Sequence, residues 1–222
     1  MSKVKVTDEI YQVGGGPLSE PDDAAIYLIH FDGHAALVDA GCGYSNEPLL
    51  ANVRACGFRP EQIELLLLTH CHFDHTGGAA SLRELLHCRT VAHQLDASFL
   101  EAGDNAATAA GWYGSTMAPC IVDRKLEGPR ETIHLGERSI EAIHIPGHSP
   151  GSLAYVTESQ GLRVLFGQDV HGPLDPSFHS NRKDYQASLK VLLALEADIL
   201  CEGHYGIYRG KREIKDFIRQ FL

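Results

Sequence analysis

The chain has 222 residues, 44% of them hydrophobic and 22% charged, and a formal net charge of −10 at pH 7. This length favours one large domain with a substantial core, and the composition excludes an intrinsically disordered chain. The acidic balance disfavours both a nucleic-acid backbone and an anionic membrane surface as the main partner, because both are bound through clustered Lys and Arg.

The N-terminal stretch MSKVKVTDEIYQVGGG lacks the apolar segment of a secretory signal, and no apolar run in the sequence is long enough for a transmembrane helix. We therefore expect a cytoplasmic protein. Its six cysteines include no C-x-x-C pair. In that compartment we expect reduced thiols, most of them packed as small hydrophobic side chains.

The first predicted elements are strands followed by a helix. Residues 24–41 contain two apolar runs around Asp32-Gly33, a dipeptide typical of the tight turn of a β-hairpin. Residues 46–56 are expected to form a helix. Residues 63–68 are almost entirely apolar, which predicts a strand buried on both faces.

A second helix is predicted over residues 78–87, with Leu82, Leu85 and Leu86 on its buried face. A short strand is expected at residues 90–92.

The less regular segment 96–130 is interpreted as a lid or pocket wall within a single domain that spans residues 1–222. Its candidate wall residues are Trp112, Tyr113 and Met117. A surface excursion without any contact with substrate is the alternative, and these side chains would then belong to the core.

Strands dominate the next part of the chain. Three strand-like runs follow, ETIHL, SIEAIHI and SLAYVTESQGLRVLF, and the last is expected to turn at Gln160-Gly161. A helix is predicted over 184–196 with Asp184 as N-cap, then a short strand ADILCEG and an amphipathic C-terminal helix over 211–222. Because hairpins accompany the helices, a layered α/β sandwich fits better than a purely parallel doubly wound sheet.

Polar side chains cluster just after the strand predicted at 63–68. The stretch LLLLTHCHFDHTGG contains an H-x-H-x-D-H motif formed by His70, His72, Asp74 and His75. Imidazole and carboxylate are metal ligands, and coordination would offset the cost of burying them at the end of an apolar strand. The intervening Cys71 and Phe73 are expected to point away and pack.

Three later strand-like runs also deliver a histidine or an aspartate just beyond their ends: His148, Asp169 and His204. Such strand ends are the usual location of function in α/β sheets. A single histidine is more often a hydrogen-bonded residue than a ligand, but this combination is improbable by chance. The sequence therefore predicts a metal site.

The motifs resemble those of the metallo-β-lactamase-fold hydrolase superfamily, and most closely its glyoxalase II-like branch. The resemblance covers nearly the whole chain and includes VDAG at residues 38–41 and PGHSPGS at residues 146–152. It implies an α/β fold of four layers, an αβ/βα sandwich with two mixed sheets between helices and the site at one edge.

The resemblance also implies two divalent metal ions, with zinc expected and iron or manganese as alternatives. The resemblance assigns the first metal to His70, His72 and His148. It assigns the second metal to Asp74, His75 and His204, and the bridge between the two metals to Asp169. Asp39 would orient these ligands through hydrogen bonds.

The expected function is hydrolysis of a small ester, thioester or lactone through a metal-bound hydroxide. Asp74 and His171 are candidates for handling protons, because His171 follows Asp169 by two positions and strand alternation would aim it toward the pocket. The expected partner is a small-molecule substrate, with no nucleic acid and no membrane, and a homodimer is left open.

Two alternatives to a hydrolase remain. Persulfide dioxygenases of the same superfamily bind one iron through two histidines and one aspartate, which His70, His148 and Asp169 would supply. A non-catalytic metal-binding sensor would keep the ligands as a structural staple. Within the hydrolases, the run DVHG at 169–172 departs from the glyoxalase II and lactonase patterns, so the substrate stays open.

Overall fold

The computed structural model describes residues 3–222, which form two β-sheets. The strands of the first sheet are β1 (Val4–Lys5), β2 (Ile10–Gly14), β3 (Ile26–Phe31), β4 (His34–Val38), β5 (Ile63–Leu67), β6 (Arg89–His93) and β7 (Arg124–Leu126). Those of the second are β8 (Arg130–Leu135), β9 (Arg138–His144), β10 (Leu153–Ser159), β11 (Leu162–Gln168), β12 (Ile199–Glu202) and β13 (Ile207–Arg209).

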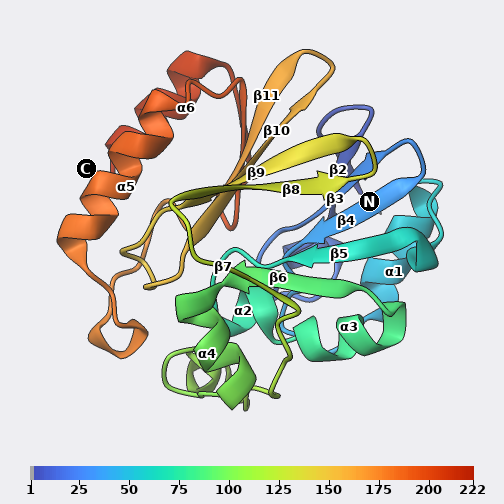
Figure 1. The fold of residues 1–222 in the computed structure, drawn as a ribbon, viewed down its shortest axis with the longest axis horizontal. Coiled ribbons are helices and arrows are strands. Elements are labelled where there is room, and N and C mark those ends of the chain that lie inside the picture. The colour runs from blue at the N-terminus through green and yellow to red at the C-terminus, as the bar shows by residue number, and fades with distance from the viewer. Residues whose placement is uncertain (1–2) are drawn as a thin grey trace.

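The helices lie outside the sheets. The α-helices are α1 (Glu47–Ala55), α2 (Phe73–Thr76), α3 (Ala79–Leu86), α4 (Gln94–Ala102), α5 (Arg182–Ala194) and α6 (Lys211–Arg219). The 3₁₀ helices are η1 (Gly16–Leu18), η2 (Pro60–Gln62), η3 (Ala110–Tyr113) and η4 (Pro176–Phe178). Helices α1 to α4 lie on the side of the first sheet, and α5 and α6 cover the second (Figure 1). The predicted four-layer αβ/βα sandwich is confirmed.

Both sheets are mixed, as predicted. In the first sheet, β1 to β4 pair antiparallel in succession, whereas β4, β5, β6 and β7 run parallel. The β3–β4 hairpin turns at Asp32 and Gly33, whose positive φ values of 49° and 93° suit that tight turn. In the second sheet, only β11 and β12 pair parallel.

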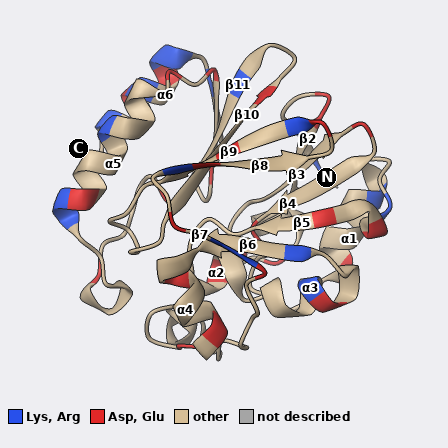
Figure 2. Cartoon of the chain, viewed as in Figure 1, with Lys and Arg blue, Asp and Glu red and all other residues tan. Residues whose placement is uncertain are grey.

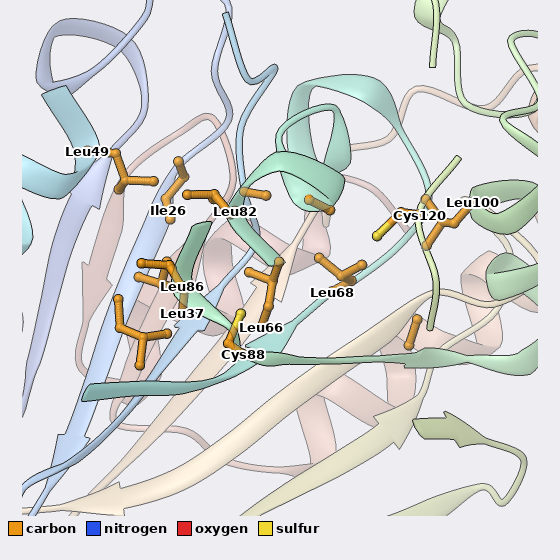
Figure 3. Packing of buried hydrophobic residues seen from close by; sticks show 14 of the residues in the cluster. Ile26, Leu37, Leu49, Leu66, Leu68, Leu82, Leu86, Cys88, Leu100 and Cys120 are labelled. Atoms are coloured by element: carbon orange, nitrogen blue, oxygen red, sulfur yellow. The ribbon is translucent and has the colours of Figure 1, made fainter. Parts of the chain in front are cut away.

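The leucine run in and just after strand β5 contributes side chains to two hydrophobic cores, one on each face of the first sheet. Leu66 and Leu68 belong to the core beneath α1, α3 and α4, part of which is seen in Figure 3. Leu65 and Leu67 belong to the core between the two sheets. This alternation places successive side chains on opposite faces, so the strand is held from both sides, as predicted. A third core lies beneath α5 and α6.

Two local expectations for the helices are wrong. Helix α5 is capped by Asn181, whose side chain accepts a hydrogen bond from the backbone N–H of Asp184 at 3.1 Å, so Asp184 lies inside the first turn. On α3, Leu82 and Leu86 are buried, but Leu85 is 55% exposed. Leu82 and Leu86 lie one turn apart on the face that packs against the sheet, and Leu85 lies outside that face.

The C-terminal helix is amphipathic, as expected. Ile214, Phe217 and Ile218 of α6 are buried against the second sheet and α5. Figure 2 shows that α5 and α6 both carry charged residues of both signs. Among residues 3–222, no helix combines the length and the apolar character needed to cross a membrane.

The segment 96–130 contains most of α4, all of η3 and strand β7. Met117 is buried in the core beneath α4, whereas Trp112 is 63% exposed. Helix α4 and strand β7, near the two ends of the segment, belong to the sandwich, and the part between them contains both the buried Met117 and the exposed Trp112.

Candidate metal centre

The candidate ligands follow the carboxyl ends of strands at one edge of the sandwich. In the first sheet, Asp39 follows β4, and His70 and His72 lie beyond its parallel neighbour β5. In the second sheet, Asp169 follows β11 and His204 lies just beyond its parallel neighbour β12. Parallel strands bring their carboxyl ends to the same edge, so residues distant in sequence meet there.

Direct hydrogen bonds join the two sheets at this edge. The backbone N–H of Leu153 donates to the carbonyl of Thr69 at 2.7 Å. The buried phenol of Tyr155 donates to the carbonyl of Leu68 at 2.8 Å. The loop that carries His70 is therefore fixed to the second sheet as well as to its own strand.

One group of ligand atoms comes from His70, His72, His148 and Asp169, with all four atoms within 4.8 Å of one another. Nε2 of His148 lies 3.3 Å from Oδ2 of Asp169 and 3.3 Å from Nε2 of His70. Nε2 of His70 lies 3.8 Å from the same oxygen.

A second group comes from Asp74, His75 and His204, also within 4.8 Å of one another. Nε2 of His204 lies 3.2 Å from Oδ2 of Asp74. Oδ1 of Asp169 lies 3.1 Å from Nε2 of His75 and 3.3 Å from Nε2 of His204. Asp169 thus directs one carboxylate oxygen to each group, which is the arrangement that a bridging ligand requires.

Several atoms at the centre are buried without a hydrogen-bond partner among the described residues, namely His72 Nε2, His75 Nε2 and Asp169 Oδ1. Buried polar atoms of this kind cost free energy unless something satisfies them. A donor set of imidazole nitrogens and carboxylate oxygens in two adjoining groups fits two divalent cations and is well suited to zinc.

Hydrogen bonds orient the histidine rings. Nδ1 of His75 lies 2.7 Å from Oδ2 of Asp39, and Nδ1 of His148 lies 2.8 Å from the carbonyl oxygen of Pro173. An N–H at Nδ1 leaves Nε2 free as a ligand atom. The structure thus places all the predicted ligands and the predicted orienting residue, Asp39, in one centre.

Asp39 reaches the other group of ligands as well. The Thr69 hydroxyl donates to Oδ2 of Asp39 at 2.8 Å and lies 3.1 Å from Nδ1 of His70. The backbone N–H of Thr69 donates to Oδ1 at 2.8 Å, and the side chain of Gln168 donates to Oδ2. One buried carboxylate therefore supports histidines of both groups.

Opposing effects set the charges of the metal-free centre. Burial lowers the pKa of His75, but the carboxylates of Asp169, Asp74 and Asp39 outweigh it and hold that pKa well above its usual value. Burial also acts against protonated His204, yet the carboxylates of Asp169 and Asp74 beside its Nε2 raise its pKa to about 10. Burial and the neighbouring histidines hold the pKa of His70 well below the usual value.

His171 lies beside the second group. Its ring centroid is 5.1 Å from that of His204, and its Nδ1 lies 2.9 Å from Oε1 of Glu202. The other oxygen of Glu202 accepts the backbone N–H groups of His204 at 2.7 Å and of Tyr205 at 2.8 Å. Sequence reasoning did not single out Glu202, although its place two residues before His204 in CEGH was a usable signal.

Asp96 is a second residue that sequence reasoning did not single out. Its carboxylate is fully buried at the start of α4. Oδ2 accepts the backbone N–H of Cys71 at 2.9 Å and the hydroxyl of Ser149 at 2.5 Å, and Oδ1 accepts the N–H of Gly151 at 2.6 Å. Asp96 thereby joins the loop of His70 and His72 to the loop of His148.

The residues between the motif ligands behave as predicted. Cys71 and Phe73 are buried in the core on the helix side of the first sheet. A cysteine packed there, with burial raising the pKa of its thiol well above the usual value, is a poor nucleophile.

The amino-acid sequence is similar to a family profile and to individual proteins. The profile of the Metallo-beta-lactamase superfamily matches residues 20–204. The acyl-coenzyme A thioesterase MBLAC2 of Gallus gallus is 29% identical over 217 residues, which cover 85% of this chain and 75% of that protein. A hydroxyacylglutathione hydrolase of Albidiferax ferrireducens is 30% identical over 193 residues, which cover 85% of this chain but only 64% of that longer protein.

Solved structures share the fold. A class B3 di-zinc metallo-beta-lactamase from an Alaskan soil metagenome is 26% identical, with a TM-score of 0.77 over 92% of this chain and 78% of that chain. The FEZ-1 metallo-beta-lactamase of Legionella gormanii is 20% identical, with a TM-score of 0.83 over 99% of this chain and 92% of that chain. At the latter identity the likeness concerns the fold alone.

Proposed function

Because the chain belongs to the metallo-beta-lactamase superfamily, as its motifs predicted, we propose that it is a hydrolase that binds two divalent cations, with zinc as the favoured ion. The observation that carries the proposal is the orientation of Asp169, whose Oδ2 lies 3.3 Å from Nε2 of His148 and whose Oδ1 lies 3.1 Å from Nε2 of His75. A single-metal site would leave the Asp74, His75 and His204 group without a role.

The proposed substrate is a small ester, thioester or lactone, and a thioester comes first. One relative is named an acyl-coenzyme A thioesterase and another a hydroxyacylglutathione hydrolase, and both names describe removal of an acyl group from a thiol. Each of these proteins extends beyond the part that this chain matches, so their thiol carriers are not transferred to this chain.

Bound divalent cations would supply positive charge that stabilises an oxyanion and lowers the pKa of the attacking water. The protein's own contribution is to hold the ligand atoms with little freedom. Asp39 fixes the rings of His75 and, through Thr69, of His70, so that Nε2 of each ring faces Asp169.

Proton transfer is proposed for His171 and Asp74. With the Nδ1–H of His171 donating to Glu202, Nε2 is the position at which the imidazolium form would carry a second proton, and that proton would pass to the leaving thiolate or alkoxide as the acyl bond breaks. Asp74, with Oδ2 3.2 Å from Nε2 of His204, is a ligand that would also accept the proton of the attacking water.

Metal analysis combined with a substrate panel tests the proposal. We expect about two zinc ions per chain and turnover of an ester, thioester or lactone that is lost with a chelator and restored by zinc. A β-lactam belongs in the same panel because of the structural neighbours. A single iron with sulfite formation from glutathione persulfide would contradict the proposal, and so would metal binding without turnover of any panel member.

A further inference from the structure

We propose that Trp112, packed against the buried ring of Phe178, forms an aromatic wall that binds an apolar group of the substrate beside the metal centre. The inference rests on the proposed hydrolase function and narrows its substrates to those with an apolar acyl chain or an apolar leaving group. It begins with the only tryptophan of the chain, which lies in the segment 96–130.

The wall is continuous with the candidate ligands. The ring centroid of Phe178 lies 4.2 Å from that of His72 and 6.3 Å from that of His148. The ring centroid of Trp112 lies 4.8 Å from that of Phe178. Phe178 is 2% exposed and Trp112 is 63% exposed, so the indole is the solvent-facing end of a row of tilted ring contacts that starts at the candidate ligand His72.

The backbone holds Trp112 in this exposed position. Helix η3 is bracketed by Ala109 and Gly114, both in the left-handed region with φ values of 58° and 62°. Just before it, the carbonyl of Thr108 accepts the backbone N–H of Phe73, the first residue of α2, at 2.7 Å. The segment is thus tied to the helix that carries Asp74 and His75, which fixes the wall relative to the metal centre.

The chemistry of the wall favours an apolar ligand. The aromatic contacts of Trp112 and Phe178 in the described chain are with each other and with the rings of His72 and His148. The cation–π contacts between residues 3 and 222 are on Tyr11 and Phe31 instead. A large exposed indole beside a catalytic centre gains stability when an apolar group covers it.

The kinetic experiment uses the zinc-loaded enzyme and two substrate series. One series varies the acyl chain from acetyl to octanoyl on a constant thiol, and the other varies the alkyl chain of the thiol on a constant acetyl group. For the native protein we expect kcat/KM to rise along one series by up to about fourfold for each methylene that becomes buried.

Variants of the wall decide whether Trp112 is the cause. Trp112→Ala should flatten that rise of kcat/KM with chain length, and Trp112→Phe should restore most of it. Ile121→Ala is the matched control, because Ile121 is 60% exposed on the same segment. The series that flattens identifies which side of the substrate meets the wall. Equal slopes for the native protein and Trp112→Ala in both series would overturn the proposal.

A binding experiment separates the wall from catalysis. Because Trp112 is the only tryptophan, its fluorescence reports directly on the wall. We expect octanoate, added below its micelle concentration to the zinc-loaded protein, to give a saturable blue shift that acetate does not give. That shift without any turnover would support the wall and contradict the hydrolase. Turnover with no shift and no dependence on chain length would support the hydrolase and overturn the wall.

Discussion

Oδ2 of Asp39 lies 2.7 Å from Nδ1 of His75, and both side chains are fully buried. The aspartate follows a strand of the first sheet directly, in a left-handed conformation with φ of 64°. Its position fixes which ring nitrogen of His75 faces Asp169. The same carboxylate accepts two hydrogen bonds from Thr69, so its influence extends to His70.

Asp39→Asn should therefore weaken zinc binding by about 10- to 100-fold, the usual effect of removing a hydrogen-bond partner of a metal ligand. The Asp39 carboxylate accepts hydrogen bonds from Thr69, His75 and Gln168 through two oxygens, whereas an asparagine amide has only one acceptor oxygen for them. Chelator competition measures the affinity. Asp216→Asn, on the exposed face of α6, is the control, and native affinity in the Asp39 variant would contradict the role.

Substitution of single ligands should separate the two metal positions. His148→Ala and His204→Ala are each expected to lower the zinc content from about two ions per chain to about one, whereas Asp169→Ala should disturb both positions and abolish nearly all turnover. Elemental analysis of dialysed protein gives the metal content. Full activity in Asp169→Ala would rule out the bridging role of its two oxygens.

Asp96→Asn should weaken both the fold and the centre. The asparagine NH₂ cannot accept a hydrogen bond, so it would leave unsatisfied either the donors of Cys71 and Ser149 or the donor of Gly151. Each unsatisfied buried donor costs about 1–3 kcal/mol. Urea unfolding of the metal-free protein measures the first effect and chelator competition the second. Asp104→Asn is the control, since its Oδ1 accepts the backbone N–H groups of Ala106 and Ala107 within its own loop. Unchanged zinc affinity would show that the link between the loops is dispensable.

Zinc affinity should rise with pH. Burial lowers the pKa of metal-free His204, but the adjacent carboxylates of Asp169 and Asp74 outweigh it and raise that pKa to about 10, so a proton occupies this ligand at neutral pH. Zinc must displace it, and each displaced proton changes the apparent affinity by about tenfold per pH unit below that pKa. Chelator competition between pH 7 and 9 measures the slope, and a flat profile would contradict protonated His204 in the metal-free protein.

The stability of the metal-free protein should show the opposite dependence. Because the pKa of His204 in the folded chain lies above its ordinary value of 6.5, protonated His204 stabilises the fold fully below about pH 6.5. This contribution is lost as the pH rises toward about 10. Unfolding of metal-free protein across this range, with His204→Ala as the comparison, tests the sign.

His171→Ala should lower kcat by about 100-fold or more while both metals remain bound, as expected for loss of a proton donor. Glu202→Gln should lower kcat less, because the amide oxygen can still accept a hydrogen bond from Nδ1 of His171. Metal content is measured alongside kcat, so that a loss of metal is not mistaken for a loss of proton transfer. Native kcat in His171→Ala would exclude the role.

The sequence by itself determined the layered fold and the candidate ligands. Hydrophobic runs of strand length, the Asp32-Gly33 turn and the amphipathic helices fix local structure, because each depends on neighbours within a few residues. The spacing of His70, His72 and Asp74 just past a buried strand identified the centre, since few other arrangements make such burial favourable.

Only the tertiary structure decided which side chains meet. Asp96 lies 53 residues before Ser149, and Trp112 contacts Phe178 from a separate loop, so no local pattern could reveal either contact. The direction in which each oxygen of Asp169 points also depends on how the two sheets pack face to face. Local propensity is encoded in neighbouring residues, whereas these contacts arise from packing between segments that the chain brings together only when it folds.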